Sequence, residues 1–365
     1  MINIYEPYLN KEITKYAHDA IDSTWISSHG KYLNLVKDEL TNIMNNNYVI
    51  LTSNGTTATH LVAIGLKYKY PKIKNIIVPN NVYVAAWNSF LMNPIFNLIP
   101  IDSDLKTWNI NLDQLDEKIK QYPSEDTAVL IVHNVGNIIN VPELKRKYKD
   151  YIFIEDNCEG FLGEYENMKS GNQSFISSVS FFGNKTLTCG EGGAIFLDDE
   201  ETFDFLNSIK SQGITNTKFI FDKLGYNYRM TNIEAALLYG QLKHKDEIIN
   251  KKSEIFNKYK KMLNGYVDFQ YIDNDTKHAN WMFGIKFKDV DINKISLNLY
   301  QQDIETRPMF PPMSCHKHLD NYSNSDNEKN SKILYESCLL LPSHPNLNLK
   351  DVEYVSQQIK KQIKK

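Results

Sequence analysis

The sequence lacks three features that would assign it at once to a large class of proteins. Its 41 Lys and Arg nearly balance its 44 Asp and Glu, so the formal net charge is only −3. This small charge gives no field over the whole chain that would attract nucleic acid or an anionic membrane. No run of about 18 apolar residues is present, so we expect no membrane span. The N-terminus has no signal-peptide-like apolar stretch, and we expect a cytoplasmic protein.

Motifs for metal and redox chemistry are also missing. The nine histidines form no HExxH or similar ligand set, so no metal site is predicted and His133 is interpreted as structural or exposed. No GxGxxG follows a first strand, which disfavours a nicotinamide-dependent dehydrogenase. Four cysteines are far apart, form no CxxC pair and are expected to be free thiols. They are Cys158, Cys189, Cys315 and Cys338.

The first part of the chain alternates between strand-like and helix-like segments. Short β-branched apolar runs end in polar residues, and segments with helical spacing of apolar residues separate them. This alternation predicts an α/β fold with a mixed, mainly parallel central sheet that helices cover on both faces. The runs lie at residues 74–81, 94–102, 127–135, 151–157, 175–183 and 192–199.

The character of the chain changes near residue 245. Residues 235–263 read as one long helical stretch, and short strand-like runs and a Pro-rich loop follow. A closing amphipathic helix carries Val352, Val355 and Ile359 at spacings of three and four. We therefore predict a large domain of residues 1–245 and a smaller α+β C-terminal domain of residues 246–365.

Lys185 has an unusual setting for a lysine. It lies in the stretch SFFGNKTLTCGEGG, residues 180–193, between an apolar run and a glycine-rich turn. An amine condenses with an aldehyde only when it is unprotonated, and apolar neighbours such as Phe181 and Phe182 favour the neutral form. Taken alone, the motif is more typical of a structural or surface lysine.

Two other features occur in the same half of the chain. Asp156 ends an apolar strand, where a buried carboxylate needs a cationic or donor partner such as the ring nitrogen of pyridoxal phosphate. Residues 52–66 open a helix whose first N–H groups suit a phosphate. A helix cap for Asp156 and an ordinary capped helix at 52–66 remain alternatives. Together with Lys185, however, the three features favour a pyridoxal-phosphate enzyme.

Several segments resemble the DegT/DnrJ/EryC1/StrS family of sugar aminotransferases, nearly from end to end. The most specific are SFFGNKTLTCGEGG at residues 180–193 and LGYNYRMTNIEAAL at residues 224–237. The resemblance implies pyridoxal 5'-phosphate as the cofactor and the fold type I of aspartate aminotransferase. The other segments are residues 23–33, 53–61, 82–90, 101–110, 154–163 and 304–313.

The resemblance implies a role for individual residues around the cofactor. Lys185 would hold the cofactor covalently and later carry the proton, and Asp156 would bind the ring nitrogen. Tyr83 would stack on the ring, and Glu159 would face the phenolate side. The phosphate would be bound by Gly55, Thr56, Thr57 and Ser180.

Other implied roles extend beyond a single chain. Asn227 matches a phosphate contact that reaches in from a partner subunit, and Arg229 would support that loop or the phosphate. These two roles imply a homodimer with shared active sites. Ser27 and Arg307 fall in segments that line the nucleotide-sugar site of the family.

The resemblance implies conversion of a nucleotide-linked 4-keto-6-deoxyhexose to the 4-amino-4,6-dideoxyhexose for glycan biosynthesis. The product would be of the viosamine or perosamine type, and L-glutamate the donor. The GNKT…GEGG form favours amination at carbon 4 over carbon 3, and Lys185 disfavours the dehydrating branch, in which His replaces it. A 3-aminotransferase and a regulator that binds cofactor or sugar without turnover stay open. The sequence does not decide the nucleotide or the hexose configuration.

Overall fold

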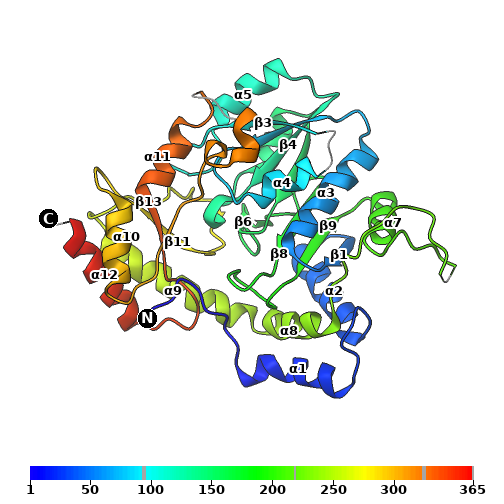
Figure 1. Cartoon of the computed structure of the whole chain (residues 1–365), viewed down its shortest axis with the longest axis horizontal. Coiled ribbons are helices and arrows are strands. Elements are labelled where there is room, and N and C mark those ends of the chain that lie inside the picture. The colour runs from blue at the N-terminus through cyan, green and yellow to red at the C-terminus, as the bar shows by residue number, and fades with distance from the viewer. Residues whose placement is uncertain (93–95, 218, 323–325, 364–365) are drawn as a thin grey trace.

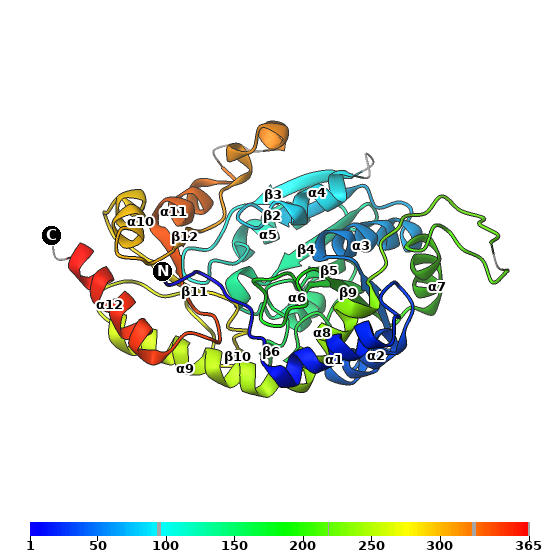
Figure 2. The same cartoon turned by 60° about the horizontal axis from the view of Figure 1, so that its bottom comes forward.

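The computed structural model describes residues 1–92, 96–217, 219–322 and 326–363. One large sheet with its helices occupies one end of the molecule, and the C-terminal part of the chain packs at the other (Figures 1 and 2). The N-terminus begins within the C-terminal part, where Ile2 forms a β-bridge with Ile304. The chain then crosses to the large sheet.

The large sheet has seven strands in the order β1-β9-β8-β5-β4-β2-β3. The five strands β8, β5, β4, β2 and β3 are mutually parallel, and β9 runs antiparallel to both of its neighbours. The sheet is therefore mixed and mainly parallel, as predicted. The strands are β1 (Tyr48–Thr52), β2 (Asn75–Pro79), β3 (Asn97–Ile101), β4 (Thr127–Val132), β5 (Ile152–Asp156), β8 (Ile176–Ser180) and β9 (Gly193–Leu197).

Helices cover both faces of this sheet because its strands are buried on both sides. On β2, Ile76 and Val78 pack with α3 and α4, whereas Ile77 between them packs with α5 and α6 on the other face. This alternation is the period of two expected for a strand. The helices of this part are α1 (Lys11–Asp22), α2 (Lys31–Met44), α3 (Gly55–Lys69), α4 (Ala85–Leu91), α5 (Leu112–Gln121), α6 (Val141–Lys147), α7 (Glu200–Ile209) and α8 (Asn232–Lys243).

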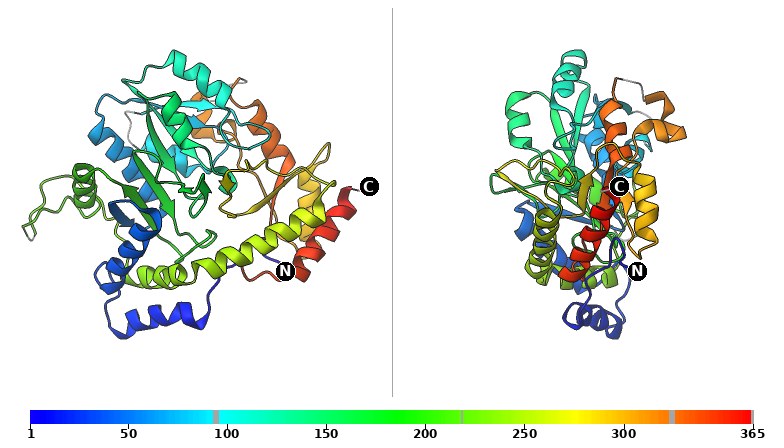
Figure 3. Two further views of the ribbon diagram at one scale, coloured as in Figure 1. Left: turned by 180° about the vertical axis from the view of Figure 1, so that it is seen from behind. Right: turned by 90° about the vertical axis from the view of Figure 1, so that its left-hand side faces the viewer.

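The C-terminal part builds its own hydrophobic core around a three-stranded sheet of order β11-β13-β12. Its long helix α9 packs against α12, as the view from behind shows (Figure 3). The predicted single helical stretch is in fact two helices, α8 and α9, which meet at His244. The elements are α9 (Lys245–Leu263), β11 (Phe283–Lys286), α10 (Ile292–Tyr300), β12 (Arg307–Pro308), α11 (Lys329–Ser337), β13 (Cys338–Leu341) and α12 (Leu349–Ile363).

Short elements complete the structure. A third sheet of order β10-β6-β7 joins residues of both parts of the chain. The predicted domain boundary at residue 245 lies at the junction of α8 and α9, and the division into domains stays a proposal. The short elements are β6 (Glu164–Tyr165), β7 (Met168–Lys169), β10 (Thr276–Lys277) and the 3-10 helices at Asn134–Gly136, Met313–Cys315 and Lys317–Tyr322.

Candidate active site

A cavity of about 370 Å³ lies at the carboxyl edge of the large sheet. Its sheet-side wall includes Gly55 at the start of α3, Asp156 at the end of β5 and Ser180 at the end of β8. Open α/β sheets bind their ligands at this edge. The opposite wall comes from the C-terminal part and includes Trp281, Met282, Arg307, Phe310 and Leu340.

Lys185 presents its amine to this cavity from the turn after β8. The Nζ atom lies 4.1 Å from the centroid of the Trp281 ring. The indole Nε1–H donates to the carbonyl of Asn184 at 3.0 Å, which fixes the ring beside the lysine. A buried aromatic face at this distance attracts an ammonium group. The structure therefore adds Trp281, which the sequence showed only as part of a strand-like run, to the candidate site.

Asp156 is a buried carboxylate without a cationic partner in the described part of the chain. It is 7% exposed, and its Oδ1 accepts the N–H of Cys158 at 3.0 Å. No ion pair of the described residues involves this carboxylate, although it lines the cavity. A buried anion is stable only when a donor or a cation binds it. Asp156 is thus suited to hold a protonated ring nitrogen.

The start of α3 offers two free N–H groups to the cavity. Asn54 caps the helix by accepting the N–H of Thr57 at 2.9 Å, and its own N–H donates to the hydroxyl of Thr57 at 3.2 Å. Within the described residues, no hydrogen bond uses the N–H of Gly55 or Thr56. A helix N-terminus of this kind binds phosphate. The hydroxyl of Thr57 serves the cap, and its predicted phosphate contact stays a prediction.

Gly55 allows α3 to approach β8 closely. A Cβ at this position would lie 2.5 Å from the Cβ of Ser180 and 2.8 Å from its Oγ. Both distances are below van der Waals contact. The absence of a side chain therefore brings the free N–H groups of α3 and the hydroxyl of Ser180 to the same side of the cavity.

Glu159 lies in the cavity wall as a buried acid. It is 5% exposed, and its Oε2 accepts the N–H of Val135 at 2.8 Å. Burial raises the pKa of Glu159 to about 7, against the opposing effects of the Lys185 charge and the Val135 hydrogen bond. Near neutral pH, Glu159 can therefore be either a hydrogen-bond donor or an anion.

Tyr83 and Arg307 line the cavity nearer to solvent. Tyr83 is 59% exposed, and its ring centroid is 6.0 Å from that of Phe310. The Arg307 Nη2 lies 3.6 Å from Glu305 Oε1, and its guanidinium carbon lies 5.2 Å from the centroid of the Tyr5 ring. An arginine beside a partly open cavity is suited to bind an anionic substrate group.

Four predicted site residues do not line this cavity in the single chain: Thr57, whose hydroxyl serves the cap of α3, and Ser27, Asn227 and Arg229. Ser27 precedes α2, and its carbonyl accepts the N–H of Asn232 at the start of α8. Asn227 and Arg229 lie in the loop between α7 and α8, where the Asn227 Oδ1 accepts the Arg229 Nε–H at 3.1 Å and the Nη2–H at 2.9 Å. The middle of this loop projects from the body of the molecule in Figures 1 and 2, whereas the carbonyl of Tyr228 accepts the N–H of Ser53 at 2.9 Å beside the start of α3.

Pyridoxal phosphate fits the groups that face the cavity. The phosphate matches the unpaired N–H groups of α3, the ring nitrogen matches the unpaired carboxylate of Asp156, and the aldehyde matches the amine of Lys185. In the described residues no group of three or more His, Cys, Asp and Glu side chains could hold a metal ion. The described helices include none with both the length and the apolar character that a membrane crossing requires.

Comparison with known proteins agrees with this geometry. The chain is 32% identical to a GDP-perosamine synthase of Escherichia coli O157:H7, over 98% of this chain and 97% of the relative. It is 30% identical to a GDP-perosamine synthase of Vibrio cholerae, over 86% of this chain and 85% of the relative.

A solved structure shows the same fold. Helicobacter pylori PseC, an aminotransferase involved in the biosynthesis of pseudoaminic acid, superposes with a TM-score of 0.92 at 22% identity, covering 100% of this chain and 99% of that chain. The predicted aminotransferase fold is therefore confirmed. The sequence profile of the DegT/DnrJ/EryC1/StrS aminotransferase family matches residues 7–360. The chain belongs to this family of aminotransferases.

Proposed function

We propose that this protein transfers the amino group of L-glutamate to carbon 4 of a nucleotide-linked 4-keto-6-deoxyhexose. The observation that carries the proposal is the convergence of Lys185, Asp156 and the start of α3 on one cavity. Relatives that cover nearly the whole chain, at 28–32% identity, bear the name GDP-perosamine synthase. They favour the perosamine type of product and GDP as the nucleotide.

The residues of this chain have separate roles in that reaction. Pyridoxal phosphate, when bound, supplies an aldehyde that accepts an amino group and a ring that withdraws electrons. The N–H groups of Gly55 and Thr56, with the Ser180 hydroxyl, hold the phosphate. Asp156 would keep a proton on the ring nitrogen, and Lys185 would take the proton from the donor α-carbon and deliver it to the former aldehyde carbon of the cofactor.

Trp281 and Glu159 support this chemistry from the cavity wall. The face of the Trp281 ring lies 4.1 Å from the Lys185 Nζ, so it attracts the amine in its protonated form when the lysine is not bound to the cofactor. Glu159 lies on the same wall and is suited to donate a hydrogen bond to the phenolate side of the cofactor when it is protonated. Buried walls of this kind also exclude water from the reacting atoms.

We further propose that two copies of the chain share their active sites. Asn227 and Arg229 do not line the cavity of their own chain, so we assign their phosphate contact to the cavity of a second copy. The same loop exposes apolar side chains, with Leu224 93% exposed and Ile220 and Phe221 more than half exposed. A second copy of the chain would remove this apolar surface from water.

An assay of the purified protein tests the function. The protein is incubated with pyridoxal phosphate, L-glutamate and a panel of GDP-, dTDP- and UDP-linked 4-keto-6-deoxyhexoses. We expect 2-oxoglutarate and amino sugar to form in equal amounts, with the GDP-linked sugar the best substrate. Release of glutamate nitrogen without an amino sugar, or no reaction with any keto sugar, would contradict the proposal.

The same products separate the alternatives. A 3-aminotransferase needs a ketone at carbon 3, so it would form no amino sugar from these 4-keto substrates and would require the 3-keto isomer. Dehydration would yield a sugar that has lost an oxygen, as for the GDP-4-keto-6-deoxy-D-mannose 3-dehydratase that is 26% identical to this chain. A regulator would bind cofactor or sugar and form neither product.

A further inference from the structure

A buried pair of side chains lies directly behind Asp156. His133 follows β4, and Glu155 precedes Asp156 on the neighbouring parallel strand β5. The His133 Nε2 and the Glu155 Oε1 are 2.9 Å apart, and both side chains are fully buried. Neither residue lines the cavity. Neither residue has a role in the proposed reaction.

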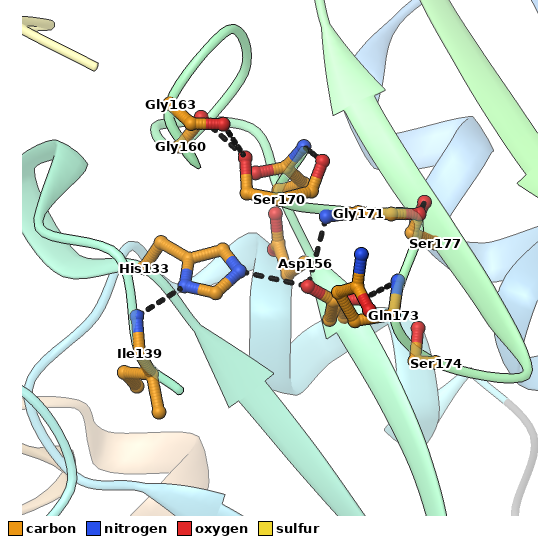
Figure 4. Close-up of polar contacts among 12 residues, drawn as sticks. His133, Ile139, Asp156, Gly160, Gly163, Ser170, Gly171, Gln173, Ser174 and Ser177 are labelled. Atoms are coloured by element: carbon orange, nitrogen blue, oxygen red, sulfur yellow. Dashed lines mark hydrogen bonds and ion pairs between the residues drawn. The ribbon is translucent and has the colours of Figure 1, made fainter. Parts of the chain in front are cut away.

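The hydrogen-bond partners of His133 define its tautomer. The backbone N–H of Ile139 donates to the Nδ1 atom at 3.1 Å, so Nδ1 carries no hydrogen. The ring hydrogen is therefore on Nε2 and points to Glu155. Figure 4 shows the imidazole of His133 with Ile139 on one side and the loop of Gly171 and Gln173 on the other.

Glu155 is held as an anion by several donors. Its Oε1 also accepts the N–H of Gly171 at 2.8 Å, and its Oε2 accepts the N–H of Gln173 at 3.2 Å. Burial acts to raise the pKa of this carboxyl, but its contacts with His133, Gly171 and Ser174 act together against burial, and the pKa is lowered. Both oxygens of the Glu155 carboxylate therefore accept hydrogen bonds, which hold the side chain in one orientation.

The loop of residues 170–173, which donates to Glu155, is hydrogen-bonded to the residues that follow Asp156. Gly171 has a positive φ of 81°, and a Cβ there would lie 2.5 Å from the Nδ2 of Asn157. The Asn157 Nδ2 donates to the carbonyl of Ser170 at 2.8 Å, and the Ser170 hydroxyl donates to the carbonyl of Gly160 at 2.6 Å. The end of β5 is therefore fixed on the side away from the cavity.

We propose that His133 and Glu155 are positioning residues that act through Asp156. Successive side chains of a strand point to opposite faces, so a fixed Glu155 sets the direction in which Asp156 leaves the backbone. Its negative charge also favours a cation beside Asp156. This inference rests on the proposed cofactor role of Asp156.

A double-mutant cycle tests whether the pair acts through Asp156. The affinity of the apoprotein for pyridoxal phosphate is measured by quenching of tryptophan fluorescence, for wild type, Glu155→Gln, Asp156→Asn and the double variant. We expect Glu155→Gln to weaken binding about tenfold alone and less than about twofold in the Asp156→Asn background. An equal loss in both backgrounds would overturn the inference and leave the proposed function in place. Absence of wild-type binding would overturn both.

Two substitutions of His133, to asparagine and to glutamine, provide a second test in case Glu155→Gln does not fold. Asparagine places its oxygen near Nδ1 and keeps the Ile139 bond, but it loses the donor to Glu155. Glutamine places its amide near Nε2 and keeps that donor. We expect His133→Asn to slow cofactor conversion by glutamate about tenfold and His133→Gln to stay within about threefold. Equal rates for the two variants would refute the positioning role.

Asp102 provides the control for a lost buried carboxylate. It is 2% exposed and accepts the N–H groups of Asn330 and Ser331, both at 2.7 Å, so it holds α11 and not Asp156. Asp102→Asn is expected to lower the melting temperature as Glu155→Gln does, and to leave cofactor affinity within about twofold of wild type. A tenfold loss in this variant would assign the effect to general destabilisation and overturn the inference.

Discussion

Replacement of Gly55 by alanine tests the phosphate site at the start of α3. The new Cβ would lie 2.5 Å from the Cβ of Ser180, whereas carbon atoms pack at about 3.5–4.0 Å. Helix and strand must therefore separate by roughly 1 Å, which moves the N–H groups of Gly55 and Thr56 away from the phosphate. Hydrogen bonds to charged groups contribute about 1.5–3 kcal/mol each. Losing one or two of them weakens cofactor binding by about 3 kcal/mol, or roughly 100-fold.

The assay is a titration of apoprotein with pyridoxal phosphate, followed by the absorbance of the bound cofactor. Gly65→Ala is the control because Gly65 lies on the same helix, and its Cβ would meet only side-chain ends, at 3.0 Å from Leu206, 3.2 Å from Thr202 and 3.3 Å from Ile176. We expect the control to bind within about threefold of wild type. Gly55→Ala binding equally well would refute the role of the helix start.

Three further substitutions test the other walls of the cavity. Lys185→Ala should abolish turnover while the protein still folds and binds cofactor, and near-normal activity would remove Lys185 from the mechanism. Asp156→Asn should lower the rate of cofactor conversion by glutamate with little change in melting temperature; an unchanged rate would make the aspartate structural. For Glu159, a folded pKa near 7 against 4.5 unfolded means that its stabilisation falls as pH rises through this window. Wild-type apoprotein should therefore lose about 2.5 kcal/mol of unfolding free energy relative to Glu159→Gln between pH 5 and 8 in urea unfolding, and parallel pH curves would contradict the buried acid.

The sequence predicted β2, β3, β4, β5, β8 and β9 of the large sheet because their apolar runs are short, β-branched and bounded by polar residues. It did not predict β1, Tyr48–Thr52, although this strand pairs with β9 at the edge of the sheet. The break between α8 and α9 was also missed. No Pro or Gly lies at His244, so local propensity gives no signal there and tertiary packing decides where the helix ends.

The candidate site was predictable where a strand or helix end carries the functional group. Asp156, Ser180 and Gly55 follow or begin regular elements, and parallel strands bring such ends to one edge of the sheet. Trp281 was not predictable in this way. It reaches Lys185 because the C-terminal part packs over the sheet, and no spacing in the sequence encodes that contact.

The pair behind Asp156 shows a different limit of sequence reasoning. Glu155 and Asp156 are neighbours, and both are buried carboxylates, yet the alternation of a strand gives them opposite surroundings. Asp156 faces the cavity and forms no ion pair with any described residue, whereas Glu155 faces His133 and the N–H groups of Gly171 and Gln173. The donors around Glu155 stabilise its carboxylate, whereas Asp156 has no cationic partner among the described residues. A carboxylate without a cationic partner is suited to bind a protonated ring nitrogen. The hydrogen bonds of Glu155 on the other face of β5 leave Asp156 in this state.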